Sequence, residues 1–377
     1  MRFRTSAPAI LIIAVAIVIA AISLLAQLST HRLVAVAHAG DYELMSHAFS
    51  STLKAMEDEA ASDAELFANM PAVRGAFAAK DRDKLFAECR ESYRMMEEKY
   101  AIDQAQFHLP PGVSFLRLGT PEKFGDEQAS YRPMLAEVHE EKSLRKGIDI
   151  TRLGPAIFGI TPVYDAAGTF LGSFEMGLEF GPVLDELKQN FSLEGAVFFE
   201  EKQLQQISTE LPADMISPKN RVGKYIRYHA THTELTAALV SDKDVEITTA
   251  KTYERTVAGV PWGVQLIPLY NYAHKQIGVV AIAASFDEDK TLATRALIWQ
   301  VLAGLIGVVL LAGLVLVVLR GTLLRPLAVL SERMTALAAG DTSQPVDAPE
   351  HFCEEMTSLA QSYEKLRERV KSESTGT

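Results

Sequence analysis

The stretch ALIWQVLAGLIGVVLLAGLVLVVL, residues 296–319, decides how the chain is organised. It is apolar except for Gln300. An α-helix over these residues, at about 1.5 Å per residue, measures roughly 36 Å, which is enough to cross the hydrocarbon core of a lipid bilayer. Two basic residues, Arg320 and Arg325, follow directly. The stretch therefore predicts a transmembrane helix with a basic far end.

Two short amphipathic helices are predicted directly after this span. They are separated by Gly340-Asp341, and each carries apolar residues at alternating spacings of three and four. Helices this short cannot bury such stripes alone, so the pattern indicates a parallel four-helix bundle built from two chains, that is, a homodimer. The two stripes are Leu327, Leu330, Met334 and Leu337, and then Met356, Leu359, Tyr363, Leu366 and Val370.

A second apolar run, residues 7–28, lies near the N-terminus behind Arg2 and Arg4. A cleavable signal peptide is the rival interpretation, but an apolar core of about 20 residues exceeds the roughly 7–15 typical of a signal sequence. Because basic residues flank both runs on the same side, the positive-inside rule places residues 1–6 and the C-terminal part in the cytoplasm. The same rule places residues 31–294 outside the membrane.

Composition and cysteine usage exclude several classes. The chain has 37 basic and 48 acidic residues, a net charge of −11, and no basic stripe that could neutralise phosphates, so we expect no nucleic-acid partner. Cys89 and Cys353 fall on opposite sides of the bilayer in this topology and cannot pair within one chain. No Cys/His spacing typical of a metal site is present, so we expect no metal and no cofactor.

Motifs of catalysis are also missing. The sequence has no phosphate loop, nucleophile elbow or zinc signature, so we expect no enzyme and no catalytic residues. His108 with Glu175 could serve as a base and its orienting group, which leaves an outer-face hydrolase as a remote alternative without a candidate nucleophile.

The outer part begins with a long helical region, residues 31–100, with a kink or restart at Pro71. The periodicity then changes to two, which is typical of strands. Residues 120–153 are expected to be loop and short helix. In the best strand, Phe170 and Phe174 are predicted on one face and Glu175 on the other. The predicted strands are 103–109, 113–119, 157–164 and 169–180 in the first part, and 195–200, 224–229, 245–249, 252–260, 263–270 and 278–286 in the second.

The segment after the second span resembles the HAMP linker of bacterial transmembrane receptors. The resemblance is carried by Leu324-Arg325-Pro326-Leu327, by the Gly340-Asp341 break and by Glu354-Glu355-Met356-Thr357. It implies a HAMP linker over residues 320–373 with a tail at 374–377. It also implies signalling roles for Pro326, Gly340 and Glu355, and a location in the bacterial inner (plasma) membrane.

The outer region resembles the double-CACHE sensor family, third subtype. The resemblance is carried by Gln104-Ala105-Gln106-Phe107-His108-Leu109-Pro110-Pro111, by Ser114-Phe115-Leu116-Arg117-Leu118, by Pro121-Glu122-Lys123-Phe124-Gly125-Asp126 and by Gly172-Ser173-Phe174-Glu175-Met176-Gly177. It implies an α+β membrane protein with a long N-terminal helix and two PAS-like antiparallel-sheet modules. We name residues 31–190 the first module, expected to be membrane-distal, and residues 191–294 the second module, expected to be membrane-proximal.

A ligand pocket is predicted on the polar faces of the first module's strands. Convergent polar groups on an apolar frame suit a small ligand such as an amino acid, an amine or an organic acid. Arginines can hold a carboxylate and Glu175 an ammonium group, although Arg117 or Arg132 could instead pair with Glu175 or Asp126. The predicted ligand-binding residues are Gln104, Gln106, His108, Phe115, Arg117, Tyr131, Arg132 and Glu175.

Together these features predict a transmembrane signal receptor, similar to chemotaxis receptors and cyclase-type sensors, in which HAMP passes a conformational signal to a cytoplasmic partner. The chain stops at Thr377 without an output domain. Either a separate cytoplasmic protein supplies the output, or the reading frame is truncated relative to such receptors. A membrane-anchored binding or scaffold protein, with HAMP as a mere dimer clasp, is the alternative.

Overall fold

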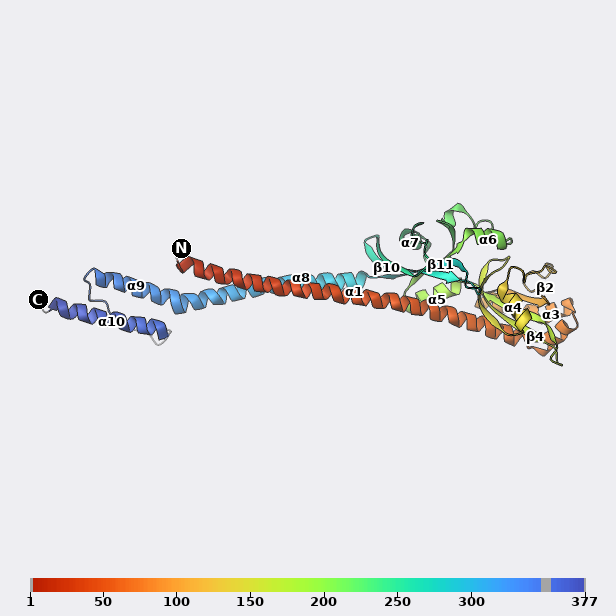
Figure 1. The fold of residues 1–377 in the computed structure, drawn as a ribbon, viewed down its shortest axis with the longest axis horizontal. Helices are drawn as coiled ribbons and strands as arrows, with labels where there is room; N and C mark the ends of the chain where they lie inside the picture. Colours follow the sequence, from red (N-terminus) through yellow and green to blue (C-terminus); the bar gives the residue numbers. More distant parts are fainter. Residues whose placement is uncertain (1–2, 347–353, 376–377) are drawn as a thin grey trace. The chain divides into compact units, whose positions relative to one another are not determined.

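A computed structural model describes residues 3–346 and 354–375 (Figure 1). The chain divides into two compact units. The sensor unit comprises Ala35–Lys290, and the other unit comprises Met1–Val34 with Thr291–Thr377.

The helical start of the chain agrees with the predicted restart at Pro71. Helix α1 (Phe3–Ala68) runs without a break, α2 (Pro71–Ala78) begins with that proline, and α3 (Arg82–Tyr100) follows. Proline suits the first helical position because it has no N–H to leave unpaired. Asp81 caps α3 by accepting a hydrogen bond from the backbone N–H of Lys84.

The first module contains an antiparallel five-stranded sheet in the order β2-β1-β5-β4-β3. The prediction of loop and short helix for residues 120–153 is wrong in part, because the segment contains a strand, β3, as well as the helix α4 (Pro133–Glu141). The strands are β1 (Ile102–Leu109), β2 (Val113–Arg117), β3 (Arg145–Ile150), β4 (Pro155–Tyr164) and β5 (Phe170–Leu178).

Two shifts in strand register overturn the predicted faces of two phenylalanines. Between β1 and β2 the register slips, so Phe115 joins the apolar side, with its ring 5.5 Å from that of Phe77. Between β4 and β5 a second slip brings Phe170 beside His139 of α4, away from Phe174. An extra residue in one strand reverses the alternation of the residues beyond it.

Helix α1 lies directly on β4. A Cβ atom at Gly159 would stand 2.3 Å from both the Cα and the N of Ala61, a distance that real structures do not tolerate. Ala60 and Ala64, both fully buried, keep this side of the helix small. The opposite face of the same sheet is covered by α4, whose Met134, Leu135 and Val138 pack against Ala156, Phe158 and Ile160.

The second module is an antiparallel six-stranded sheet in the order β7-β8-β6-β11-β10-β9. The predicted strand at 245–249 is absent: these residues form bends and irregular backbone, with Val245 buried in the core. The elements are α5 (Gly181–Phe191), β6 (Glu194–Glu200), α6 (Glu201–Ile207), the 3-10 turn η1 (Pro218–Asn220), β7 (Arg221–Val222), β8 (Tyr225–Ala230), α7 (Thr233–Leu239), β9 (Lys251–Val257), β10 (Val260–Tyr270) and β11 (Gln276–Ser285).

The other unit holds the apolar helices. Two helices are long and apolar enough to cross a membrane: the start of α1 and the segment Thr294–Leu319 of α8 (Asp287–Leu319). Within this unit, Nε2 of Gln300 donates a hydrogen bond of 2.7 Å to the backbone oxygen of Ser23. The one polar residue of the predicted span therefore bonds to the backbone of the other apolar helix.

A π-helical turn (Arg320–Leu324) connects α8 to α9 (Arg325–Ala338), and α10 (Glu354–Thr375) follows the connector. A small core joins them, formed by Leu330, Leu337, Val346, Ala360 and Tyr363. The Tyr363 hydroxyl donates to the backbone oxygens of Gln344, at 3.1 Å, and Arg333, at 3.3 Å. The α9 and α10 helices are thus packed together within one chain.

Candidate functional site

The predicted polar face of the first module exists and is buried. In the β1–β5 register Gln106 stands opposite Glu175, and His108 stands opposite Ser173. Residues directly opposite each other in an antiparallel pair point to the same side of the sheet. The side chains of His108, Ser173 and Glu175 are therefore brought together, and each is at most 1% exposed.

Arg132 lies at the centre of this cluster. It precedes the first turn of α4 and is fully buried. Its Nη1 lies 2.8 Å from both carboxylate oxygens of Glu175, and its Nε lies 3.2 Å from Oδ2 of Asp149. Burial opposes the charge of the guanidinium, but the two facing carboxylates outweigh it and raise the pKa of Arg132. The cluster thus holds one cation between two anions.

The two histidines beside this ion pair are held neutral. Burial, and secondly the charge of Arg132, keeps the pKa of His108 well below its usual value. Burial lowers the pKa of His139 to about 4, against a smaller opposing effect of Glu175. His139 Nε2 lies 2.9 Å from Oγ of Ser173, which lies 3.5 Å from Nδ1 of His108. The histidines can therefore donate or accept hydrogen bonds without carrying charge.

Arg117 takes the structural role that the sequence left open. Its Nη2 donates to both carboxylate oxygens of Asp126, at 2.9 and 2.8 Å, and its Nη1 donates to the backbone oxygen of Lys123 at 3.0 Å. This pairing fixes the loop after β2. Of the predicted site residues, Arg117 is thus committed to a carboxylate within the chain.

Three further predicted residues, Gln104, Tyr131 and Phe115, lie in different surroundings. Gln104 accepts a hydrogen bond of 2.7 Å from the hydroxyl of Thr151. Tyr131 lies beside Arg132 in the sequence, and burial raises the pKa of its hydroxyl. Phe115, predicted to line the pocket, belongs to the apolar core for the reason given above.

Sequence reasoning missed four members of the cluster. Asp149 lies on β3, a strand that was not predicted because its sequence is polar. Gln128 lies in the loop before α4, and its Oε1 accepts a hydrogen bond of 3.4 Å from Nη1 of Arg132. Ser173 and His139 complete the set. Ser173 could have been found, since it shares the alternation of Glu175, whereas the contact of His139 depends on how α4 crosses the sheet. Ser173 is fully buried beside both histidines.

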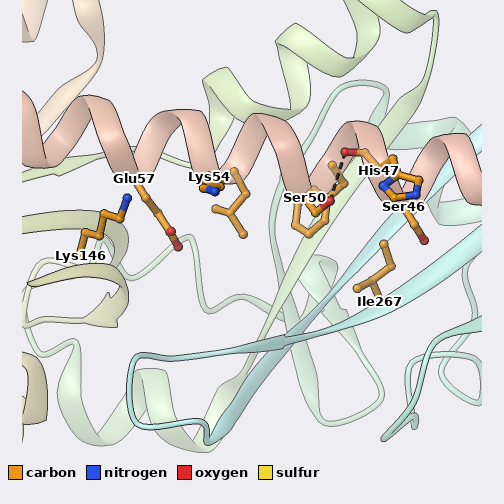
Figure 2. A pocket seen from close by; sticks show the side chains of 9 residues that line it. Ser46, His47, Ser50, Lys54, Glu57, Lys146 and Ile267 are labelled. Atoms are coloured by element: carbon orange, nitrogen blue, oxygen red, sulfur yellow. Dashed lines mark hydrogen bonds between the residues drawn. The ribbon is translucent and has the colours of Figure 1, made fainter.

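Two cavities lie in this part of the molecule, one beside the polar cluster and one along α1. A cavity of about 160 Å³ touches three predicted residues, Gln104, Gln106 and Arg117, and reaches Glu97 and Asp103. A larger pocket of about 520 Å³ lies along α1 and is lined also by Lys146 and Ile267. Figure 2 shows Lys146 and Glu57 at one end of this pocket, where Nζ of Lys146 pairs with Asp58. Of these two cavities, the smaller one borders the predicted site.

The predicted signalling residues lie at the element boundaries of α9 and α10. Pro326 is buried near the start of α9. Gly340 has φ = 95°, a left-handed conformation that glycine adopts without strain, directly after α9. Glu355 is the second residue of α10, and its side chain lies outside the described ones.

Comparisons with known proteins agree with this architecture. A family model described as the double sensory domain of two-component sensor kinases (dCache_3) matches residues 42–288, and the HAMP domain model matches residues 318–372. Both matched domains are signalling modules. A search of curated protein sequences gave no significant match.

Solved structures of sensor domains are similar at low identity. The chain shares 13% identity (TM-score 0.35) with an extracellular ligand binding receptor from Desulfohalobium retbaense, over 63% of this chain but only 39% of that one. It shares 11% (TM-score 0.39) with the ligand-binding domain of the Campylobacter jejuni chemoreceptor Tlp3, over 66% and 91% of the two chains. It shares 12% identity (TM-score 0.37) with the periplasmic domain of Vibrio cholerae LuxQ, over 65% of this chain and 97% of that one.

The sensory match covers well over half of the chain, and HAMP follows the second candidate span. The chain therefore belongs to the double-CACHE (dCache_3) sensory-domain family, joined to a HAMP domain in a transmembrane, ligand-sensing signal transducer.

Proposed function

We propose that the first module binds a small solute carrying both a carboxylate and an amino group, as an amino acid does, with amines and organic acids as the narrower alternatives. The observation that carries this proposal is a set of buried polar atoms without hydrogen-bond partners among the described residues. Around the central ion pair these are Nη2 of Arg132, Nε2 of Gln106 and Nε2 of His108.

Unpartnered buried polar atoms are costly, at about 1–3 kcal/mol each. Native proteins keep few of them, and a group of them at one place points to a role other than stability. Here Arg132 and Gln106 offer unpartnered donors. The Glu175 carboxylate is held by Nη1 of Arg132 and keeps lone pairs that can accept further hydrogen bonds. A ligand carboxylate could accept a hydrogen bond from the unpartnered Nη2 of Arg132. A ligand ammonium group could donate to the remaining lone pairs of the Glu175 carboxylate, beside its ion pair with Arg132. A solute with both charges satisfies both sides of the cluster.

Access to the cluster requires movement, because its side chains are buried. The segment Gln128–Arg132 and α4 cover the polar face, so we infer that they open to admit the ligand and close over it. A ligand shifts such an equilibrium only by its difference in affinity for the two arrangements. This difference would be the source of the signal.

The test is a thermal-shift screen of the full-length protein in neutral detergent against amino acids, amines and organic acids. We expect one class to raise the unfolding midpoint. Glu175→Gln should abolish the shift from a ligand with an amino group, and Gln205→Leu, an exposed surface change in the second module, should leave it intact. If Gln106→Leu and Glu175→Gln both keep the full shift, the ligand binds elsewhere.

We also infer that the functional unit is a homodimer. Within one chain Leu330, Leu337 and Tyr363 are buried, whereas Met334, Leu359 and Leu366 are 46–48% exposed. Part of each predicted apolar stripe is thus left exposed and available to a partner helix, as a four-helix bundle requires. Disulfide cross-linking of single cysteines placed along residues 327–370 should give dimers, and a ligand-dependent change of pattern would separate a signalling bundle from a passive clasp.

The proposed topology places both termini in the cytoplasm, with residues 31–294 outside the bacterial inner membrane. Its support is the basic residues that flank both apolar helices. The natural cysteines provide the test, because Cys89 is buried and burial raises the pKa of its thiol to about 12. A membrane-impermeant maleimide should label Cys353 only after the membrane is permeabilised. Labelling of Cys353 in intact cells would reverse the topology.

We also propose a separate cytoplasmic partner that receives the signal. A HAMP domain transmits a signal to an output element, and we propose that a chemotaxis-type or other signalling protein receives it. Ligand-dependent co-purification of one cytoplasmic protein with the full-length receptor would support this interpretation. A scaffold role predicts instead that any bound protein is retained equally with and without the ligand.

A further inference from the structure

The second module has a cavity that none of the functions above uses. Its volume is about 520 Å³, and it lies between β7, β8, the turn η1 and the residues that follow α7. Its floor is apolar, and its rim is strongly charged. The lining residues include Lys219, Arg221, Arg227 and Lys243, with Asp242 as the acidic member and Val222, Ala237 and Val240 as the apolar ones.

Three of the four cations at this cavity lack an acidic partner. Arg221 is paired, since its Nη2 donates to Oε1 of Glu201 at 2.6 Å. Lys219, Arg227 and Lys243 form no ion pair in the part of the chain that the structure describes. The oxygen Oδ1 of Asp242 accepts a hydrogen bond of 2.9 Å from the backbone N–H of Gly223. A chain of net charge −11 thus gathers uncompensated positive charge at one hollow.

Arg227 is the most informative of these residues. It is half-buried, and burial lowers the pKa of its guanidinium. The only hydrogen bond of its side chain to a described residue runs from Nη2 to the backbone oxygen of Lys219, at 3.5 Å. Arg255, half-buried in the same module, shows the usual arrangement, with Nη2 donating to Asp244 at 2.9 Å. A desolvated guanidinium without a counter-ion is unfavourable, and a bound anion would remove this cost.

We propose that this cavity binds a small organic anion with two or more negative charges. The guanidinium of Arg227 can contact a carboxylate or phosphate group bidentately, and Lys219 and Lys243 add point charges at the rim. The apolar floor formed by Val222 and Val240 accommodates a carbon skeleton. The cavity thus gives the receptor a second ligand site, of a chemistry different from that in the first module.

The experiment uses citrate as the probe and isothermal titration calorimetry of the full-length protein in neutral detergent at low ionic strength. We expect Arg227→Gln to weaken citrate binding about tenfold or more. Lys243→Gln, at an exposed position where folding is not at risk, should weaken it in the same direction. Lys275→Gln, an exposed lysine of the β10–β11 turn, is the matched control and should leave binding unchanged.

Repeating the titration in nanodiscs identifies the natural source of the anion. If anionic lipid abolishes citrate binding that zwitterionic lipid allows, the site takes a lipid headgroup; if both allow it, the site takes a soluble anion. The proposal is overturned if the wild-type protein gives no heat with millimolar citrate. It is equally overturned if Lys275→Gln weakens binding as much as Lys243→Gln, since this would reflect the general charge of the surface.

Discussion

The two sensory modules share an architecture and use one face of it in opposite ways. In both, an antiparallel sheet carries α1 on one face, and a shorter helix covers the other face: α4 in the first module and α7 in the second. Under α4 the strands bury Gln106, His108 and Glu175. Under α7 they bury Val264, Leu266 and Val279. The same covered face is a polar site in one module and an apolar core in the other.

This difference means that burial of the covered face contributes differently to the stability of the two modules. An apolar face gains free energy from burial, at about 25 cal/mol per Å². A polar face buried to the same degree gains little and must satisfy every atom, which the first module does not do. We therefore expect the first module to tolerate apolar replacement of the uncharged, unpartnered Gln106, and the second module to be destabilised by polar replacement in its core. Hydrogen exchange of the full-length protein resolves the two modules and measures the local opening free energy of each.

The largest effect is expected from Arg132→Met. Arg132 pairs with both Glu175 and Asp149, so its removal takes this cation from two buried carboxylates, and the opening free energy of the first module should fall by about 3–5 kcal/mol. The second module should keep its protection. Arg94→Met, which breaks the exposed pair of Arg94 with Glu91, is the matched control and should change nothing measurable. Equal losses of opening free energy from both variants would show that the buried ion pairs stabilise the first module no more than the exposed pair does.

The next effect should come from Val279→Thr in the second module. The change preserves shape and places a hydroxyl in a fully apolar surrounding, at a cost of about 1–3 kcal/mol. Exchange in β11 should accelerate while β1 and β5 stay protected. Unchanged protection of β11 would mean that this face is wetter than its burial indicates.

A smaller effect should follow from pH. The pKa of His139 in the folded protein is about 4, below the value near 6.5 of an unfolded histidine. Between these values the unfolded chain binds more protons, so stability conferred by neutral His139 is present above about pH 6.5 and is lost as the pH falls toward 4. After screening by solvent we expect a loss on the order of 1 kcal/mol in the first module. His139→Gln should flatten this dependence; an unaltered pH profile would assign it to other groups, with buried His108 the first to test.

The smallest effect, and the most diagnostic, is expected from Gln106→Leu. Its Nε2 atom is buried without a partner, so replacement by an apolar side chain of similar size should be neutral or stabilise the first module by up to about 1 kcal/mol. Ligand binding should weaken at the same time. A gain in stability coupled to a loss of binding is the sign of a functional group retained at a structural cost, and a clear destabilisation would instead make Gln106 part of the fold.

Much of this site could be predicted from alternation alone. Gln106, His108 and Glu175 were placed on one face by period-two patterns, and the antiparallel register brings them together. The restart at Pro71 and the heptad pattern of α9 and α10 were equally readable, because proline and apolar spacing act locally.

What failed depended on contacts distant in sequence. The extra residue near Phe115 is tolerated because Phe77, on another element, receives its ring. Strand β3 could not be predicted, because it carries the polar residue Asp149. The burial of Asp149 depends on its ion pair with Arg132, which directly precedes α4 and does not lie at a neighbouring position in the sequence. The segment 245–249 has β-branched residues typical of a strand, yet it pairs with no strand of the described sheet, and its Val245 packs into the core instead.

The close approach at Gly159 has a mechanical consequence. Where two elements meet through side chains, a small shift can be absorbed by a change of rotamer. At this point main chain meets main chain, since no atom beyond the backbone separates β4 from Ala61. The contact is therefore a stiff joint: when β4 is displaced toward the helix, the backbone at Ala61 has to move with it, and that part of the displacement reaches α1 undamped.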